Sequence, residues 1–478
     1  MEQKNFFLNK NINYFFILSF LVILTFFLRL YKFDQIGFWG DEYLTFTLSE
    51  PIYNYNFIHN KVLASGDLVP PFYYFVLNIY NFFFGHTAHS IRVFHIIFGS
   101  LNILLSFLIS RLILKKTESL FVLYFLALNV FLIWCSTEAR VASFALFFQL
   151  LSILFFLYSL QNVKSKFFSL YIVLLFLLNF LSLTTHPLSI IIVISQIFFL
   201  LVNNNYKKKN IFLIVIVLSV IFYILFNLDY FIWSLKGTRL GHNQLTVNFF
   251  IGYNFKHYFN SYILGGIHLF IITLTSYRIF KKTVKDDYLF FLFIIFIFTY
   301  LFIIIGTIFF TGLNGQRYWS YLVPIIIIIN VYYLREIKRN FLSTVIIFFL
   351  IIYTFIIYLD KINKPQLRKP DTPGLIKIFN ETNINYVVSE NYFHFENYLK
   401  KGYKDFSKKI ISEVEINSLK DDFWYLCLDL SWVQAKGSYY DEIYECSPKL
   451  KNIYQHKKMN SIKLNGFVIT KYEYVSFN

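Results

Sequence analysis

Long apolar segments, separated by short polar connections, make up most of the chain. A helix needs roughly 20 mostly apolar residues to cross the hydrocarbon core of a bilayer. Eleven segments approach that length, so the pattern predicts an all-α polytopic membrane domain. They are residues 13–29, 91–113, 119–135, 140–160, 167–184, 187–202, 211–228, 259–279, 288–310, 318–334 and 341–359.

The pattern changes near residue 360. Residues 1–360 hold 26 Lys/Arg and 13 Asp/Glu, whereas the much shorter stretch 361–478 holds 18 and 14. Three short runs of the late stretch, rich in aromatic and β-branched residues, are predicted to be strands, with helices between them. These runs are Tyr386–Val388, Trp424–Leu428 and Gly466–Thr470. We therefore expect a membrane domain over residues 1–360 and a small α/β accessory domain over residues 361–478.

The basic residues of the short connections predict the orientation. With the N-terminus in the cytoplasm, 17 of the 26 basic residues of the membrane domain fall on the cytoplasmic side. An odd number of spans then puts residues 361–478 outside. We expect a multi-pass protein of the plasma (inner) membrane with an extracytoplasmic, periplasmic C-terminal domain.

The composition agrees with this picture. The chain is 57% hydrophobic and only 15% charged, with a mean hydropathy of +0.55, which excludes a soluble globular, collagen-like or disordered protein. Its net charge of +17 does not indicate a nucleic-acid partner, because the basic residues are dispersed among the connections instead of forming one patch.

Three cysteines are too few for a cysteine-rich metal site or a disulfide framework. Cys427 and Cys446 lie 19 positions apart in the predicted outer domain. An oxidising compartment permits a disulfide between them. The alternative is that Cys427 is an inert core residue of its strand.

The first outer loop, residues 31–90, contains an adjacent acidic pair, Asp41 and Glu42. The apolar stretches Tyr43–Leu48 and Phe72–Phe84 are too short to span and are expected to lie in the membrane interface. Asp41 would then lie at headgroup level, where a carboxylate can take the proton of an acceptor hydroxyl. The alternative is that the pair only stabilises the first turn of an interfacial helix.

Further charged residues gather at the outer ends of the predicted spans. Asp67 precedes Pro70-Pro71 and is either a helix cap or a functional residue. Arg140, close behind Glu138, and Arg317, next to Tyr318, are unfavourably placed near helix amino ends unless they bind an anion. Snorkelling to lipid phosphate is the alternative for each arginine.

His186 also lies at an outer boundary, where a structural role and a binding role both remain open. No His-Glu-x-x-His, Asp-x-Asp or histidine cluster indicates a metal, and a divalent ion between Asp67 and His186 has no support in the sequence. The chain shows no phosphate-binding Walker loop or G-x-G-x-x-G motif, which argues against an ATP-driven pump or a nucleotide-sugar site. We predict no cofactor.

A series of short motifs resembles the GT-C-fold glycosyltransferases that use polyprenyl-phosphate sugars, the superfamily of bacterial protein O-mannosyltransferases and the lipid A aminoarabinose transferase. The similarity covers about residues 20–330 in order. The motifs are L-R-L-Y (28–31), W-G-D-E-Y (39–43), D-L-V-P-P-F-Y-Y (67–74), I-R-V-F-H-I-I-F-G (91–99), W-C-S-T-E-A-R (134–140), T-T-H-P (184–187) and Q-R-Y-W-S-Y-L-V-P (316–324).

The resemblance implies that Asp41 is the catalytic carboxylate and Glu42 its partner. It also implies that Asp67, Glu138 and Arg140 lie in the cavity for lipid phosphate and acceptor. The chain departs from the family at Pro187, after the histidine, and at the Trp-Cys pair before the W-C-S-T-E-A-R serine.

The expected activity is an inverting hexosyl or pentosyl transfer from a polyprenyl-phosphate donor to a cell-envelope acceptor, in lipopolysaccharide or other glycan synthesis or on a protein. Arg140 and Arg317 would hold the donor phosphate, with His186 and Tyr318 beside them. An O-antigen ligase or polymerase and a lipid-linked-sugar transporter are the alternatives. Transporters carry ionisable residues near the bilayer midplane, whereas those of this chain gather at the outer rim.

Overall fold

The computed structural model describes most of the chain, which divides into two compact units. The first comprises Met1–Tyr31, Tyr55–Val76 and Phe94–Asn363, and the second Lys32–Asn54, Leu77–Val93 and Lys364–Asn478. The described residues are 2–31, 33, 37–38, 40–65, 67, 69–203, 206, 208–237, 256–281, 286–309, 316–337, 341–362, 372–389, 399, 402–403, 406–428, 456–464 and 467–475.

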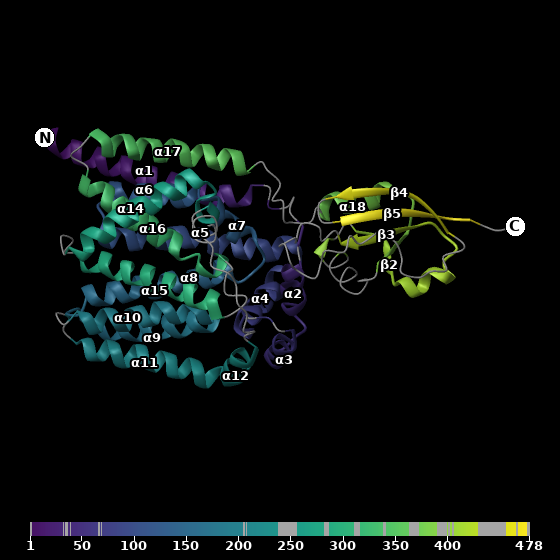
Figure 1. Ribbon diagram of the computed structural model, residues 1–478, viewed down its shortest axis with the longest axis horizontal. Coiled ribbons are helices and arrows are strands. Elements are labelled where there is room, and N and C mark those ends of the chain that lie inside the picture. Colours follow the sequence, from purple (N-terminus) through teal and green to yellow (C-terminus); the bar gives the residue numbers. More distant parts are fainter. Residues whose placement is uncertain are drawn as a thin grey trace. The chain divides into compact units, whose positions relative to one another are not determined.

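The first unit is a bundle of long apolar helices, most of which lie side by side with similar axes (Figure 1). The helices of the bundle are α1 (Glu2–Leu30), α5 (Ala88–Ile113), α6 (Lys116–Ala127), α7 (Val130–Thr137), α8 (Ala142–Gln161), α9 (Phe168–Thr185), α10 (Ile190–Val202), α11 (Lys209–Phe226), α14 (Tyr262–Phe280), α15 (Asp287–Phe309), α16 (Leu322–Ile337) and α17 (Phe341–Ile362). Two short helices, α12 (Leu228–Gly237) and α13 (His257–Phe259), connect α11 with α14.

Each predicted span coincides with one or two of these helices, so the chain is a multi-pass membrane protein with a helical membrane domain. Within the described residues, seven helices are long and apolar enough to cross a bilayer, or eight if the bent pair α6–α7 counts as one span. Two shorter apolar helices, Tyr14–Leu30 and Pro187–Val202, accompany them. The count of eleven spans stays a prediction.

The predicted span 119–135 is not one straight helix. It breaks between α6 and α7, with an angle of 58° between the two helices. Asn129 produces this break, because its side-chain oxygen accepts the Leu132 N–H at 2.9 Å and caps α7. The Asn129 amide nitrogen also donates to the Tyr258 carbonyl at 2.9 Å, which fixes the bend to α13. The turn that follows α7 carries two of the candidate site residues.

Polar side chains hold neighbouring helices of the bundle together. Ser152 on α8 donates to the Asn179 oxygen on α9 at 2.5 Å, and Asn179 donates to Gln196 on α10 at 2.8 Å. Gln196 closes the ring by donating back to Ser152 at 2.9 Å. All three side chains are buried, so each hydrogen bond joins helices in a region from which water is excluded.

Three short helices fill the first outer loop. They are α2 (Gly40–Leu48), α3 (Tyr55–Ser65) and α4 (Pro71–Phe84). The helices α2 and α4 contain the two interfacial segments expected from the sequence. The helix α3 was missed because the sequence that forms it, YNFIHNKVLAS, mixes polar and apolar residues with little hydrophobic contrast between its faces.

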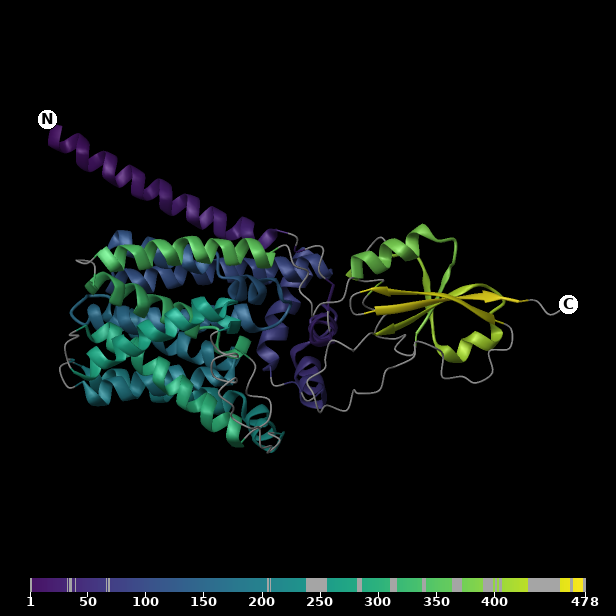
Figure 2. The ribbon, with the colours of Figure 1, turned by 45° about the horizontal axis from the view of Figure 1, so that its top comes forward.

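The second unit contains a five-stranded sheet with strand order β2-β1-β3-β5-β4, seen nearly edge-on in Figure 2. The strands β1 and β2, and β1 and β3, are parallel, whereas β3–β5 and β4–β5 are antiparallel. The strand bounds are β1 Tyr386–Val388, β2 Lys409–Ile411, β3 Phe423–Leu428, β4 His456–Leu464 and β5 Phe467–Tyr474.

The two faces of this sheet have separate apolar contacts. Trp424 of β3 packs against Phe379 of α18 (Thr372–Glu381), with 6.4 Å between ring centroids. Phe423 points to the opposite face and stacks on Tyr472 of β5 at 5.0 Å. The small α/β fold agrees with the sequence prediction. The strands β2 and β4 were not predicted: β2 has only three residues, and the sequence of β4, HKKMNSIKL, is that of a polar edge strand.

Cys427, near the end of β3, is disulfide-bonded. Cys446, the partner considered from the sequence, lies outside the described residues. Cys135 on α7 is a free, buried thiol.

Candidate functional site

The first unit brings Asp67 and Arg140 together, although 73 positions separate them in the sequence. Arg140 Nη1 donates to Asp67 Oδ2 at 3.0 Å, and Nη2 donates to Oδ1 at 3.1 Å. Tyr74, in the first turns of α4, donates its hydroxyl to the same carboxylate. The Arg140 side chain is 5% exposed and that of Asp67 8%, so the pair is shielded from solvent.

Local backbone turns place both partners. Asp67 lies in the loop before α4, where its Oδ1 accepts the Val69 N–H at 3.2 Å. The loop continues through Pro70 before the helix begins at Pro71, so Asp67 is not the helix cap that the sequence allowed. Arg140 lies in the turn between α7 and α8, and its N–H donates to the Glu138 carbonyl at 2.8 Å.

Glu138 forms a second ion pair from the same turn. Arg317 Nη1 donates to Glu138 Oε1 at 2.9 Å; the glutamate side chain is fully buried and that of the arginine is 14% exposed. Arg317 and Tyr318 were expected to open the tenth span. They lie instead on a separate 3-10 turn, Gln316–Trp319, and α16 begins only at Leu322. This turn directs Arg317 toward the α7–α8 connection.

His186 lies beside both ion pairs, between α9 and the short turn Pro187–Ser189. Its ring is 5.0 Å from that of Tyr318, and its Nδ1 accepts the Leu188 N–H at 3.3 Å. Burial, reinforced by the positive charge of Arg317, lowers the pKa of His186 to about 4. The imidazole is therefore neutral at pH 7, and because Nδ1 is an acceptor its proton is on Nε2.

The charges in this cluster balance without a ligand. Burial raises the pKa of the Asp67 carboxyl, but the charge and hydrogen bonds of Arg140 lower it. Hydrogen bonds from Tyr74 and the Val69 N–H add to that effect, so the pKa of Asp67 lies below its usual value. Burial raises the pKa of the Tyr74 hydroxyl, which stays protonated. Two arginines thus face two carboxylates, a neutral histidine and the protonated Tyr74.

The second unit holds the other two predicted site residues, Asp41 and Glu42, in the first turn of α2. Asp41 is partly exposed, whereas Glu42 is fully buried, 3.7 Å from Arg92 Nη2. The Arg92 Nη2 also donates to the Gly37 carbonyl at 2.8 Å. Glu42 and Arg92 therefore join the segment before α2 to the start of α5 and are placed to position Asp41.

Amide side chains of α4 stabilise the other end of α2. Asn78 donates to the Glu50 carbonyl at 2.5 Å, and Asn81 donates to the Ser49 carbonyl at 2.9 Å. These contacts fix the carboxyl end of α2 while Arg92 fixes the segment that precedes it. The helix that carries Asp41 is thus held at both ends.

Two residues of these clusters were not recognised in the sequence as individual groups. Tyr74 is one of four aromatic residues in Pro71–Phe75, and only the contacts of its hydroxyl with Asp67 and Arg140 distinguish it. Arg92 had a usable signal, since it is a charged residue in the first turns of a predicted span, where a buried counter-charge is needed.

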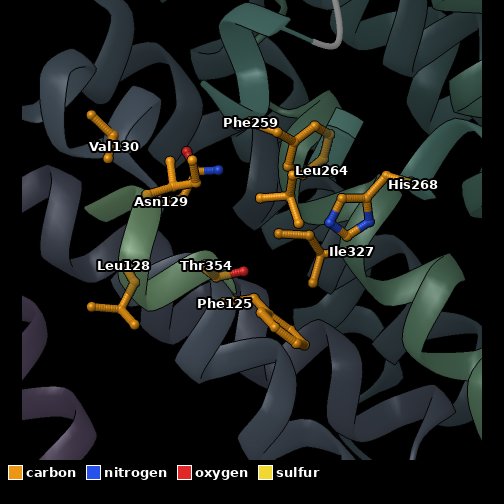
Figure 3. Close-up of a pocket in the computed structure, with 10 residues that line it drawn as sticks. Phe125, Leu128, Asn129, Val130, Phe259, Leu264, His268, Ile327 and Thr354 are labelled. Carbon is orange, nitrogen blue, oxygen red and sulfur yellow. The ribbon is translucent and has the colours of Figure 1, made fainter. Parts of the chain in front are cut away.

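A small cavity of the first unit is a different feature (Figure 3). It measures about 10 Å³ and is lined by Asn129, His268 and Thr354, among mostly apolar residues. This volume holds about one water molecule, so the cavity is no substrate site. Among the described residues, no group of three or more His, Cys, Asp or Glu side chains is placed to hold a metal ion.

The fold belongs to a known class of membrane proteins. No family model matches the sequence, and no curated protein does. Solved structures of GT-C-fold glycosyltransferases do match, which confirms the fold predicted from the motifs.

One of these is ArnT from Cupriavidus metallidurans bound to undecaprenyl phosphate. The match covers 95% of this chain and 97% of that one, with a TM-score of 0.56 and 11% identity. Another is the Archaeoglobus fulgidus oligosaccharyltransferase AglB in complex with an inhibitory peptide and a dolichol-phosphate. It matches over 87% of this chain and 69% of its own, with a TM-score of 0.52 and 12% identity.

An Archaeoglobus fulgidus oligosaccharyltransferase in complex with Zn and sulfate matches over 82% of this chain with a TM-score of 0.50 and 12% identity. In that comparison the present chain spans 62% of the other chain's length. At these identities the similarity concerns the fold.

Proposed function

We propose that this protein is a membrane glycosyltransferase that moves a sugar from a polyprenyl-phosphate carrier to a cell-envelope acceptor, with inversion at the anomeric carbon. The observation that carries the proposal is the cluster of Arg140 and Arg317 with their buried carboxylates in a GT-C fold. The structural neighbours add support, because one was solved with undecaprenyl phosphate and another with a dolichol-phosphate.

In this proposal the two arginines bind the phosphate of the donor. An arginine makes bidentate, charge-assisted hydrogen bonds to phosphate as well as to carboxylate. Arg140 already makes that geometry with Asp67, so its guanidinium is oriented before a donor arrives. During transfer the lipid phosphate leaves with an additional negative charge, which fixed arginines stabilise. His186, as a neutral Nε2–H donor, contributes one further hydrogen bond.

Asp41 is the proposed general base. It would remove the proton of the acceptor hydroxyl while the acceptor oxygen attacks the anomeric carbon from the face opposite the phosphate. Its partial exposure suits proton transfer better than the full burial of Glu42. We assign Glu42, through its contact with Arg92, the role of positioning Asp41.

The proposed location is the plasma (inner) membrane, with residues 361–478 and the site on the extracytoplasmic side. Single cysteines that replace the exposed residues Lys208 and Lys377 test the orientation. A membrane-impermeant maleimide should label them from opposite sides of the membrane. Labelling of both from the same side would contradict the orientation.

Donor choice is the decisive test of the function. Purified full-length protein should transfer a monosaccharide from polyprenyl monophosphate to envelope glycan or protein extracts and release polyprenyl phosphate. The Arg140→Ala variant should lose this activity, whereas Arg335→Ala is the matched control, since Arg335 is also ion-paired but with Glu118 and Glu336. Turnover with diphosphate-linked oligosaccharide alone would instead identify a ligase-type enzyme and overturn the proposal.

A further inference from the structure

A polar pocket lies at one end of the sheet in the second unit and has a volume of about 590 Å³. Its walls come from the residues just before β1, those just before β3 and the last residues of β5. These segments meet because β1 and β3 run parallel while β5 runs antiparallel to β3. The volume falls within the roughly 300–1,000 Å³ typical of small-molecule sites. None of its residues belongs to the ion-pair cluster described above.

The charges of the pocket favour an uncharged ligand. Lys420 and Lys471 line it together with Asp421 and Asp422, so its formal charges cancel. Thr382, another lining residue, directly follows the last residue of α18. The helix thus contributes its carboxyl end, whereas phosphates and other anions bind at helix amino ends.

The hydrogen-bonding groups of the pocket are available to a ligand. Asn383, Asn385 and Asp421 are exposed, and within the described part of the chain their side chains have no protein partner. A carboxamide offers donors and an acceptor side by side, and a carboxylate offers two acceptors. Such paired groups suit the neighbouring hydroxyls of a sugar ring, each of which both donates and accepts.

Aromatic side chains complete the pocket. Tyr386 and Tyr474 are half-buried and line it. Trp424 is buried and fixed, because its indole N–H donates to Thr382 Oγ1 at 3.2 Å and its ring packs on Phe379. Aromatic rings offer flat, weakly negative faces on which polarised C–H groups pack. A ligand with both hydroxyls and an apolar C–H face matches this combination.

We infer that this pocket is a binding site for a neutral oligosaccharide. Its most direct use is to hold the glycan acceptor of the reaction proposed above. The role as an acceptor site rests on the proposed function. The inference that the pocket binds a saccharide is independent of that function.

The test uses the full-length protein in detergent and fluorescently labelled, short neutral oligosaccharides of hexose and N-acetylhexosamine units. At least one of them should bind, and the double variant Asn383→Ala/Asp421→Ala should weaken its binding about tenfold or more. Asn460→Ala is the matched control, since Asn460 is an exposed asparagine of β4 outside the pocket. Its binding curve should equal that of the wild type. Both substituted pocket residues are exposed, so the fold should survive.

The proposal is overturned if none of these saccharides binds or if the double variant binds them as the wild type does. Binding of an unstructured Ser/Thr-rich peptide in place of every saccharide would also overturn it and would indicate a protein acceptor. Release of polyprenyl phosphate from the donor, measured in parallel, separates the two proposals. Saccharide binding without use of any lipid-linked donor would reject the proposed function and leave the pocket assignment intact.

Discussion

Arg140 and Asp67 form a buried, two-point ion pair, with N–O distances of 3.0 and 3.1 Å. The carboxylate occupies the two guanidinium nitrogens that would bind a phosphate. A donor phosphate must therefore either displace Asp67 or use the remaining face of the guanidinium. In both cases Asp67 compensates the buried positive charge of Arg140 until a ligand binds.

Replacing Arg140 by Ala should leave Asp67 buried without its cation. Loss of one partner of a buried ion pair costs about 3–5 kcal/mol, so the thermal unfolding midpoint of the purified protein should fall. Binding of polyprenyl phosphate should also weaken by at least about tenfold, as expected for a lost charge-assisted hydrogen bond of roughly 1.5–3 kcal/mol.

A double variant separates these two effects. In Asp67→Asn/Arg140→Leu both charges are gone, so much of the stability should return while donor binding stays weak. Recovery of binding in this double variant would assign the pair a purely structural role.

The pH dependence of stability should report on His186. Because the folded-state pKa is about 4, below the 6.5 of an exposed histidine, the unfolded chain binds a proton between these values that the folded chain does not. The free energy of unfolding should therefore rise as the pH increases from about 4 to about 6.5. Asp67, whose pKa is lowered from 3.8, contributes only at more acidic pH.

The His186→Asn variant is the test. Asparagine can still accept the Leu188 N–H as a cap but does not titrate. Unfolding midpoints measured between pH 4.5 and 7 should vary less in this variant than in the wild type. If the unfolding midpoint depended on pH equally in the variant and the wild type, His186 would not be buried in its neutral form.

The sequence was sufficient for the class of fold because apolar run length is a direct physical requirement of membrane spans. The sequence also singled out the charged residues near span ends, since an Asp, Glu or Arg there has few structural explanations, and the structure joins four of them in two ion pairs. Their roles in binding and catalysis stay predictions. The pairing of Asp67 with Arg140 could not be derived, because it depends on how α4 and the α7–α8 turn approach each other. The break at Asn129 could not be predicted either. A single Asn within an apolar run usually forms a hydrogen bond to a neighbouring helix, and the sequence does not show that this one caps a new helix.

Gly99 of α5 should be intolerant of any side chain. A Cβ at this position would overlap the hydroxyl of Ser136 on α7, and that hydroxyl accepts a hydrogen bond from Arg29 Nε at 3.1 Å. Gly99→Ala should therefore separate α5 from α7 and lower stability by about 1–3 kcal/mol, the usual effect of overpacking.

Gly266→Ala on α14 is the matched control for this substitution. Nothing lies within 4 Å of a Cβ built there. Alanine should gain roughly 0.5–1 kcal/mol of helix stability at such a position. Unfolding midpoints that shift in opposite directions would support the close approach of α5 and α7, and equal shifts would contradict it.

Asp41→Asn should separate catalysis from helix capping. The substitution keeps the size of the side chain but removes the base, so turnover with polyprenyl-phosphate sugar should fall by at least about 100-fold. Binding of polyprenyl phosphate should remain, because the arginines and not Asp41 hold the phosphate. The control is Asp229→Asn, which makes the same change at another first-turn carboxylate, on α12.

If Asp41 only stabilises α2, asparagine should replace it well, since Asn caps helices about as strongly as Asp. Near-normal turnover of Asp41→Asn would therefore reject Asp41 as the base and make Glu42 or Asp67 the next carboxylate to test.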